Sequence, residues 1–150
     1  MMFVRPFDSS DRPVLREIFV RSRKKAFPWQ PAHAFQLGDF DEQTAGESLL
    51  VAEDDGIVIG FLSLWEPDDF IHHLFVDPEW IRRGIGTALL RALPGWLTTR
   101  YRLKCLTRNA LALAFYSSHG FVEIGCGTGE EGDYLLMEFD PQYCATRVQV

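Results

Sequence analysis

The chain has 150 residues with 47% hydrophobic and 24% charged content, a composition that predicts one compact domain over residues 1–150 with a substantial buried core. Its net charge of −6 argues against a nucleic-acid partner, because nucleic acids select basic surfaces. The N-terminal segment has no apolar signal core and no apolar run approaches the ~20 residues of a membrane span, so we expect a cytoplasmic protein with no membrane partner.

The first predicted elements are a strand and a helix. Residues Phe3–Phe7 form a short apolar run whose proline places it at the edge of a sheet. The polar residues Asp8–Asp11 offer caps for a helix that buries Ile18 and Phe19 and ends in the basic run Arg21–Lys25. We interpret that basic run as a solvated helix end rather than a binding patch.

The segment Phe27–Phe35 combines aromatic residues and prolines without a helical or strand period. Such a segment forms either a structural plug or the wall of a pocket. Aromatic side chains on loops often serve binding, so Trp29 is the residue of this segment that we expect to contact a ligand.

A short helix and a hairpin lead into the centre of the chain. The helix is expected over Asp41–Glu47. The strands Leu49–Glu53 and Ile57–Trp65 flank the tight-turn signal Asp55-Gly56, so they are predicted to pair antiparallel. A turn rich in acidic residues then leads to the next strand.

The central stretch reads as a strand, a loop and a helix. Phe70–Val76 is an apolar run with the length and residue types of a buried strand. Gly84 and Gly86 follow where the helical spacing of Ile85 and Leu89 begins. The first N–H groups of such a helix lack partners and glycine lets a bulky anion approach them, which predicts a phosphate or pyrophosphate cradle. The glycine spacing fits neither the Rossmann fingerprint nor the P-loop.

The last helix is predicted over Ala110–His119, after the strand Tyr101–Thr107, with Asn109 as its N-cap. Two stripes run along this helix. One stripe carries Asn109, Ala112 and Tyr116. The other carries Leu111, Phe115 and His119 and is expected to face the core.

A final hairpin of Val122–Gly125 and Tyr134–Phe139 is predicted, joined by the glycine-rich, acidic loop Cys126–Asp133. We expect this loop to be mobile, with carboxylates such as Glu130 either attracting an amine or forming a solvated tip. The three cysteines lack a CxxC pair, so neither a disulfide framework nor a zinc site is indicated. Cys105 is expected to be a core residue of its strand.

Two motifs resemble those of the GNAT superfamily of acyl-CoA-dependent N-acetyltransferases. The first, Ile81-Arg82-Arg83-Gly84-Ile85-Gly86, resembles the family's pyrophosphate loop of Gln or Arg, two residues, Gly, any residue, and Gly or Ala. Ile81 replaces the Gln or Arg, which we expect to weaken or reshape cofactor binding rather than abolish it. The second motif is Asn109-x-x-Ala112-x-x-Phe115-Tyr116-x-x-x-Gly120-Phe121.

The resemblance implies an α+β fold of three layers, with a mixed, mostly antiparallel central sheet flanked by helices and acyl-CoA bound at the splayed central strands. It implies an enzyme that moves an acetyl group from acetyl-CoA, its cosubstrate, to a primary amine by direct transfer through a tetrahedral intermediate. The implied cofactor-binding residues are Leu74, Phe75, Val76, Arg82, Arg83, Gly84, Ile85, Gly86, Thr87, Asn109, Ala112 and Tyr116.

The expected acceptor-binding residues are Trp29, His73 and Glu130, and no metal is expected. A small-molecule amine and a peptide amine are both open as the acceptor, and a homodimer is open as the assembly. The resemblance does not identify the amine or the preferred acyl chain.

Two histidines on the strand Phe70–Val76 are candidates for the base, because the unperturbed pKa of histidine, about 6.5, is close to working pH. Strand alternation predicts that His72 and His73 point to opposite faces. The resemblance favours His72, which stands where many family members carry a glutamate used for this purpose, and it implies Tyr116 as the general acid. A carboxylate or water is the alternative base, and a covalent route through Cys126 is disfavoured because no histidine lies beside it in sequence. The alternative function is a non-catalytic acyl-CoA sensor.

Overall fold

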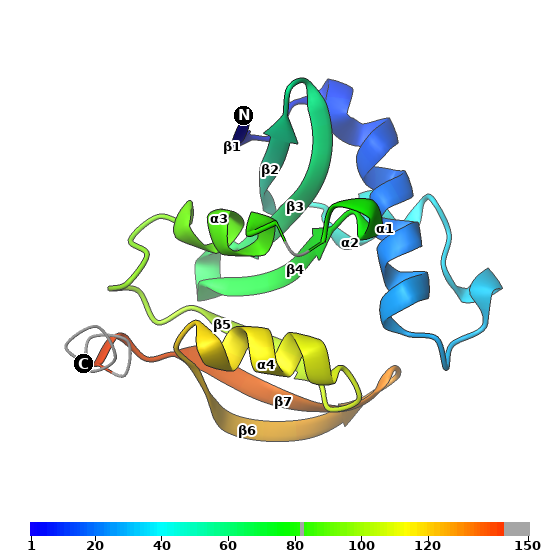
Figure 1. Ribbon diagram of the computed structural model, residues 1–150. Coiled ribbons are helices and arrows are strands. Elements are labelled where there is room, and N and C mark those ends of the chain that lie inside the picture. Colours follow the sequence, from blue (N-terminus) through cyan, green and yellow to red (C-terminus); the bar gives the residue numbers. More distant parts are fainter. Residues whose placement is uncertain (82, 143–150) are drawn as a thin grey trace.

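In the computed structural model, which describes residues 1–81 and 83–142, the chain forms one seven-stranded sheet flanked by helices (Figure 1). The strands are β1 (Met2–Pro6), β2 (Ser48–Asp54), β3 (Ile57–Trp65), β4 (Phe70–Val76), β5 (Arg102–Leu106), β6 (Phe121–Gly129) and β7 (Gly132–Phe139). The helices are α1 (Arg12–Ala26), α2 (Asp39–Gln43), α3 (Ile85–Arg91) and α4 (Ala110–Ser118), with short 3-10 turns between elements.

The strand order is β1-β2-β3-β4-β5-β7-β6. The β4–β5 pair is parallel, and the other neighbouring pairs are antiparallel. The predicted α+β fold with a mixed, mostly antiparallel sheet is therefore confirmed.

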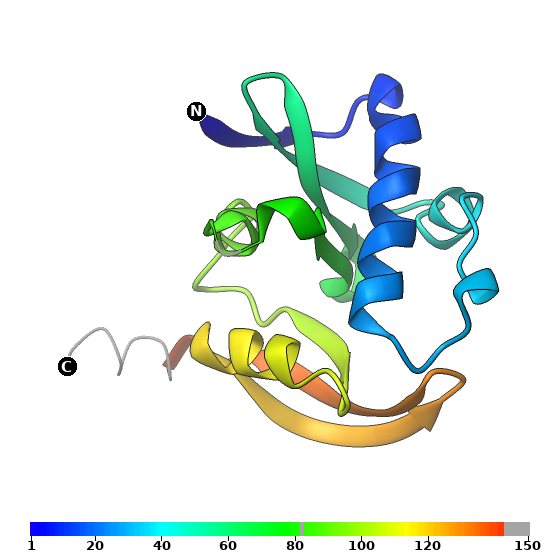
Figure 2. The same cartoon turned by 45° about the vertical axis from the view of Figure 1, so that its right-hand side comes forward.

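Alternation along the central strands divides the core between the two faces of the sheet. Val51 of β2 and Phe61 of β3 pack in one cluster with Phe19 of α1. Leu62, the next residue of β3, packs in a second cluster with Leu89 of α3. In Figure 2, α1 and α3 are seen on opposite sides of these central strands.

The two halves of the sheet separate where β4 and β5 meet. These strands pair only at Phe70 with Arg102 and at Ile71 with Leu103. From His73 onward β4 keeps its pairing with β3 but has no partner in β5, so its other backbone edge is open. This confirms the predicted splayed central strands.

The structure differs from the sequence prediction in the turn of the β6–β7 hairpin and in α4. The expected mobile loop Cys126–Asp133 is mostly strand, because β6 continues to Gly129 and β7 begins at Gly132. Leu111 does not face the core but is 82% exposed. The buried side of α4 is centred on Ala112 and Tyr116, which places Leu111 at its solvent edge.

Other expectations concern short segments. Helix α2 ends at Gln43, so Glu47 is not helical but lies directly before β2. Cys105 is buried in β5, as predicted, and Cys126 is exposed on β6; both are free thiols, whereas Cys144 lies outside the described residues. Among residues 1–81 and 83–142, no helix has the length and apolar character needed to cross a membrane.

Candidate active site

A cavity of about 470 Å³ lies at the opening between β4 and β5. Arg23 and Phe27 of the α1 region line it together with both histidines of β4. Asn109 and Tyr116 line it from α4, which covers the opposite face of the sheet. Molecules entering from the two faces can therefore meet at the open edge of β4.

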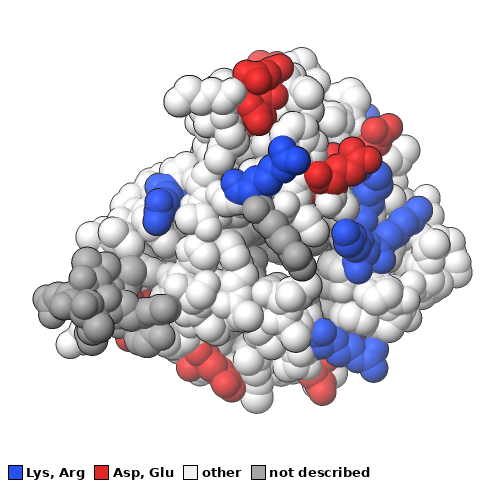
Figure 3. Space-filling model, in the orientation of Figure 1, with Lys and Arg blue, Asp and Glu red and all other residues white. Residues whose placement is uncertain are grey.

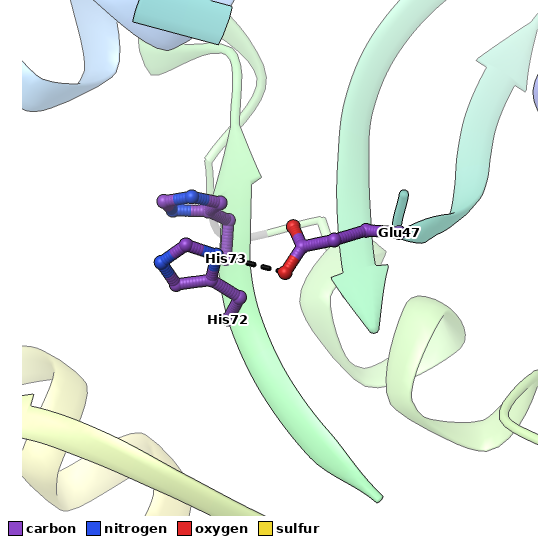
Figure 4. Close-up of side chains that lie close together, drawn as sticks. All are labelled: Glu47, His72 and His73. Atoms are coloured by element: carbon purple, nitrogen blue, oxygen red, sulfur yellow. Dashed lines mark hydrogen bonds and ion pairs between the residues drawn. The ribbon is translucent and has the colours of Figure 1, made fainter. Parts of the chain in front are cut away.

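A β-bulge in β4 places both histidines on the same side of the strand. Ser63 of β3 pairs with His73, but the next residue, Leu64, pairs with Ile71, so His72 is the extra residue of the bulge. The two imidazole rings stack with their centroids 3.8 Å apart (Figure 4). The expectation that these side chains point to opposite faces is therefore wrong, because the bulge interrupts the alternation on which it rests.

Glu47 holds the ring of His72 in place. The two residues share a hydrogen bond of 2.9 Å between Nδ1 of His72 and Oε2 of Glu47. The Glu47 side chain is 6% exposed, whereas that of His72 is 41% exposed and borders the cavity. Because an ionised carboxylate only accepts, Nδ1 of His72 donates and Nε2 retains the lone pair that can take up a proton.

Sequence reasoning missed Glu47, which it assigned to the end of a helix. This residue lies 25 positions before His72, and β3 separates β2 from β4. The contact therefore follows from the register of three strands, and no local sequence signal could have identified it.

His73 is the buried member of the pair. Its ring lies edge-on to Phe19 of α1, with centroids 4.8 Å apart, and borders the cavity. Burial, with smaller contributions from His72 and Arg23, holds the pKa of His73 well below its usual value. The ring is therefore neutral at physiological pH, and His73 is a poor proton acceptor.

Arg23 departs from the expectation that the basic run Arg21–Lys25 is solvated. It is only 5% exposed, and its guanidinium stacks on Phe19 at 3.7 Å and pairs with Asp39 at 3.1 Å. Burial lowers the pKa of Arg23, although Asp39 opposes this effect. Arg23 thus contributes a neutralised cation to the wall of the cavity.

Tyr116 lines the cavity on the side opposite the histidines. Its ring packs against Phe115 and Phe121, with centroids 5.3 and 5.6 Å apart. Burial raises the pKa of Tyr116 well above its ordinary value, and Cys105 adds to the effect. Burial also raises the pKa of the Cys105 thiol to about 11. The phenol therefore keeps its proton across the physiological range.

Asn109 is the N-cap of α4, as predicted. Its Oδ1 accepts a hydrogen bond of 3.2 Å from the backbone N–H of Ala112. The amide Nδ2 of Asn109 is the remaining polar group of this side chain, and it offers two donors at the cavity wall.

The two glycines of the predicted anion cradle have different roles. Gly84 adopts φ +74° directly before α3, and a Cβ added there would meet nothing within 4 Å. A Cβ on Gly86 would lie 3.0 Å from Cζ of Phe115. Gly84 therefore supplies a left-handed conformation, whereas Gly86 allows α3 and α4 to approach each other closely.

The other predicted cofactor-binding residues of this loop contact different parts of the protein. The hydroxyl of Thr87 donates to Nε2 of His119 at 2.8 Å, because Nδ1 of His119 already donates to the Phe115 carbonyl. Ile85 is buried in the core, and the guanidinium of Arg83 lies 4.9 Å from the ring of Trp80. Arg82 lies outside the described residues.

Basic side chains occur on the face of the molecule that carries α3 and α1, although the chain as a whole is acidic (Figure 3). Arg83 and the exposed Lys24 and Lys25 belong to these two regions. Acidic side chains are interspersed with them on the same face, so these basic groups do not form a continuous patch.

On the open edge of β4, Leu74 and Phe75 line the cavity, whereas Val76 packs against the core. On the acceptor side, Glu130 and Glu131 of the β6–β7 turn also line the cavity. Trp29 is not among the lining residues. Its ring instead packs 5.6 Å from that of Phe27 and 5.1 Å from the Arg108 guanidinium.

Comparison with known proteins identifies the family. A family profile described as the acetyltransferase (GNAT) domain matches residues 45–123. The chain is 29% identical over 136 residues to the peptidyl-lysine N-acetyltransferase YiaC of Escherichia coli, covering 85% of this chain and 88% of that protein. It is 32% identical over 108 residues to a ribosomal protein bS18 alanine N-acetyltransferase of Salmonella typhimurium, covering 69% and 71%. The chain belongs to the GNAT acetyltransferase family.

A solved GNAT structure agrees with the fold. The PaiA N-acetyltransferase of Thermoplasma acidophilum, determined in complex with coenzyme A, superposes with a TM-score of 0.74 at 19% identity, covering 93% of this chain and 99% of that one. The matched GNAT profile extends from before Glu47 to beyond Tyr116 and so includes the histidines of β4 and Tyr116, whereas Arg23 and Glu130 lie outside it. Membership makes the protein an acetyl-CoA-dependent acyltransferase.

The residues of this GNAT protein fit acetyl-CoA as cosubstrate. The unpaired backbone of β4 is free to bind an extended chain with amide groups, and the left-handed Gly84 opens the start of α3 to a pyrophosphate. Nδ2 of Asn109 offers a further donor. Ile81, which replaces the expected Gln or Arg, is 44% exposed beside this loop and offers no charge.

Proposed function

We propose that the protein is an N-acetyltransferase that moves an acetyl group from acetyl-CoA directly to a primary amine. The observation that carries this proposal is the arrangement of proton-transfer groups around one cavity. His72, held by Glu47, borders it from β4, and Tyr116 borders it from α4. Acetyl-CoA supplies an activated acyl group when it is bound.

His72 takes the proton from the attacking amine. A primary alkyl amine has a pKa of about 10.4 and is mostly protonated at neutral pH, so the reaction needs a proton acceptor. Nε2 of His72 is available for this role because Nδ1 is engaged with Glu47. The buried carboxylate of Glu47 fixes the ring orientation and stabilises the imidazolium that forms, as carboxylates do beside catalytic histidines in other enzymes.

Tyr116 protonates the departing thiolate. Its phenol is protonated at neutral pH, but burial raises its pKa, so the transfer requires the thiolate to be desolvated in the same cavity, which Tyr116 lines. The two proton-transfer groups lie on different walls, which suits a reaction in which an amine and a thioester approach from opposite sides.

The acceptor is a cationic amine, and a peptide amine is the first class to test. Glu130 and Glu131 place carboxylates at the cavity, and these attract a protonated amine. The two protein N-acetyltransferases to which the chain is similar act on lysine and alanine amines of proteins. Trp29 supports this wall indirectly through Phe27, which lines the cavity.

An amine screen with acetyl-CoA tests the proposal. The panel contains lysine peptides with blocked N-termini, alanine peptides with free N-termini, and polyamines, and the formation of free thiol is followed. We expect turnover with at least one class. A matched variant, Cys126→Ser, should keep the same rate because direct transfer does not use this exposed thiol. Calorimetric binding of acetyl-CoA without turnover of any amine would instead favour the sensor.

A further inference from the structure

Three buried polar atoms near Glu47 lack hydrogen-bond partners within the described part of the chain. Oε2 of Glu47 binds His72, but Oε1 has no partner. The same is true of Nε2 of His73 and of Oγ of Ser63, which is paired with His73 across β3 and β4. A buried polar atom without a protein partner needs a water molecule or an ion.

The chemistry of this cluster favours an ion. Glu47, His72 and His73 each offer one ligand atom, and these atoms lie within 4.8 Å of one another. Two imidazoles and one carboxylate form a common ligand set of zinc, and the nitrogen ligands disfavour magnesium and calcium. Figure 4 shows the Glu47 carboxylate directed toward the histidine pair from the segment that leads into β2.

Coordination requires a modest rearrangement. Zinc bonds of about 2.0–2.2 Å place tetrahedral ligand atoms roughly 3.3–3.6 Å apart, so the cluster must close by about 1 Å. The ring of His72 must also turn out of its stack with His73, and its exposed side chain has room to do so. Arg23 is the nearby cation on the cavity wall, and Asp39 neutralises it.

We propose that Glu47, His72 and His73 bind a divalent transition-metal ion of the Zn²⁺ class, and that the bound ion inhibits acetyl transfer by occupying the base. The inhibitory effect rests on the proposed function, whereas metal binding does not. Sequence spacing did not indicate this site, because Glu47 lies 25 residues before His72 and meets the histidines only through the sheet.

Metal binding is tested directly on the full chain. Zn²⁺ is titrated into the metal-free protein by calorimetry, and Co²⁺ is used to report coordination geometry by its visible absorption. We expect one ion per chain and the strong bands of a tetrahedral Co²⁺ site. Glu47→Gln and His72→Ala should each weaken binding at least about tenfold. The control His33→Ala removes an exposed histidine elsewhere and should leave the affinity unchanged.

The outcomes separate the two proposals. Absence of saturable binding, or equal affinity in Glu47→Gln and the unmutated protein, overturns the metal site, provided circular dichroism shows that the variant is folded. Inhibition is measured by mass spectrometry of the acetylated peptide, because the thiol of coenzyme A itself binds Zn²⁺. We expect Zn²⁺ to inhibit acetyl transfer and a chelator to restore the rate. Zn²⁺ should inhibit His73→Asn less than the unmutated protein, when each rate is compared with that of the same protein without metal. Binding without inhibition overturns the inhibitory role, whereas binding in a protein that acetylates no amine overturns only the proposed function.

Discussion

Replacing Gly84 with alanine should weaken coenzyme A binding through the backbone alone. Gly84 has φ +74°, and a Cβ added there meets nothing within 4 Å, so the substitution creates no clash. Alanine in the left-handed region costs about 1–2 kcal/mol. If the loop relaxes to negative φ in the free protein, its N–H groups turn away from the cradle. Restoring the left-handed conformation on binding then costs the same ~1–2 kcal/mol, which corresponds to roughly 5–30-fold in coenzyme A affinity.

Gly56 provides a matched control. It also has positive φ, +82°, and open space at its Cβ, but it lies in the turn between β2 and β3. Both variants are compared by calorimetry with coenzyme A and by thermal unfolding. We expect both to lose stability and only Gly84→Ala to lose affinity. Equal affinity of Gly84→Ala and the unmutated protein would refute the assignment of this loop to the pyrophosphate.

Three further predictions concern α4. Tyr116→Phe should lower kcat by roughly 10²-fold or more while leaving coenzyme A affinity unchanged, and equal turnover would exclude a general-acid role. Burial raises the pKa of Tyr116, so the unfolded state loses the phenol proton first as pH rises, and the free energy of unfolding should fall above pH ~10. Denaturant titrations should show a smaller fall in Tyr116→Phe, and an equal dependence on pH in the two proteins would contradict the raised pKa. Asn109→Ala should destabilise the protein by about 1 kcal/mol, whereas Asn109→Ser, which keeps a cap, should retain most of this stability in the same titration.

Local sequence signals predicted the features that depend on neighbouring residues. The bounds of β3 and β4, the N-cap Asn109 and the position of Gly84 at the start of α3 all follow from short-range patterns. Hydrophobic periodicity and turn residues determine such features, and the two motifs added the family and the splayed sheet.

The features that were missed depend on contacts between distant strands. The bulge at His72 is set by the register of β3 against β4, and the partnership with Glu47 needs β2, β3 and β4 in their final order. Packing also gives Gly86 a role other than the anion cradle that the sequence predicted, because its lack of a side chain makes room for Phe115 of α4. Leu111 was assigned to the core because periodicity gives the stripes of a helix but not which stripe meets the sheet.

The most direct test of the account is a double-mutant cycle on acetyl transfer, measured as kcat/KM for the best amine in the presence of a chelator. The four proteins are the unmutated chain, His72→Ala, Glu47→Ala and the double variant. We expect His72→Ala to cost roughly 10²-fold or more and Glu47→Ala to cost less. If Glu47 acts through His72, the double variant should be about as slow as His72→Ala alone. Full additivity of the two effects, or an unchanged rate in His72→Ala, would contradict the proposal that His72 takes the amine proton while Glu47 holds its ring.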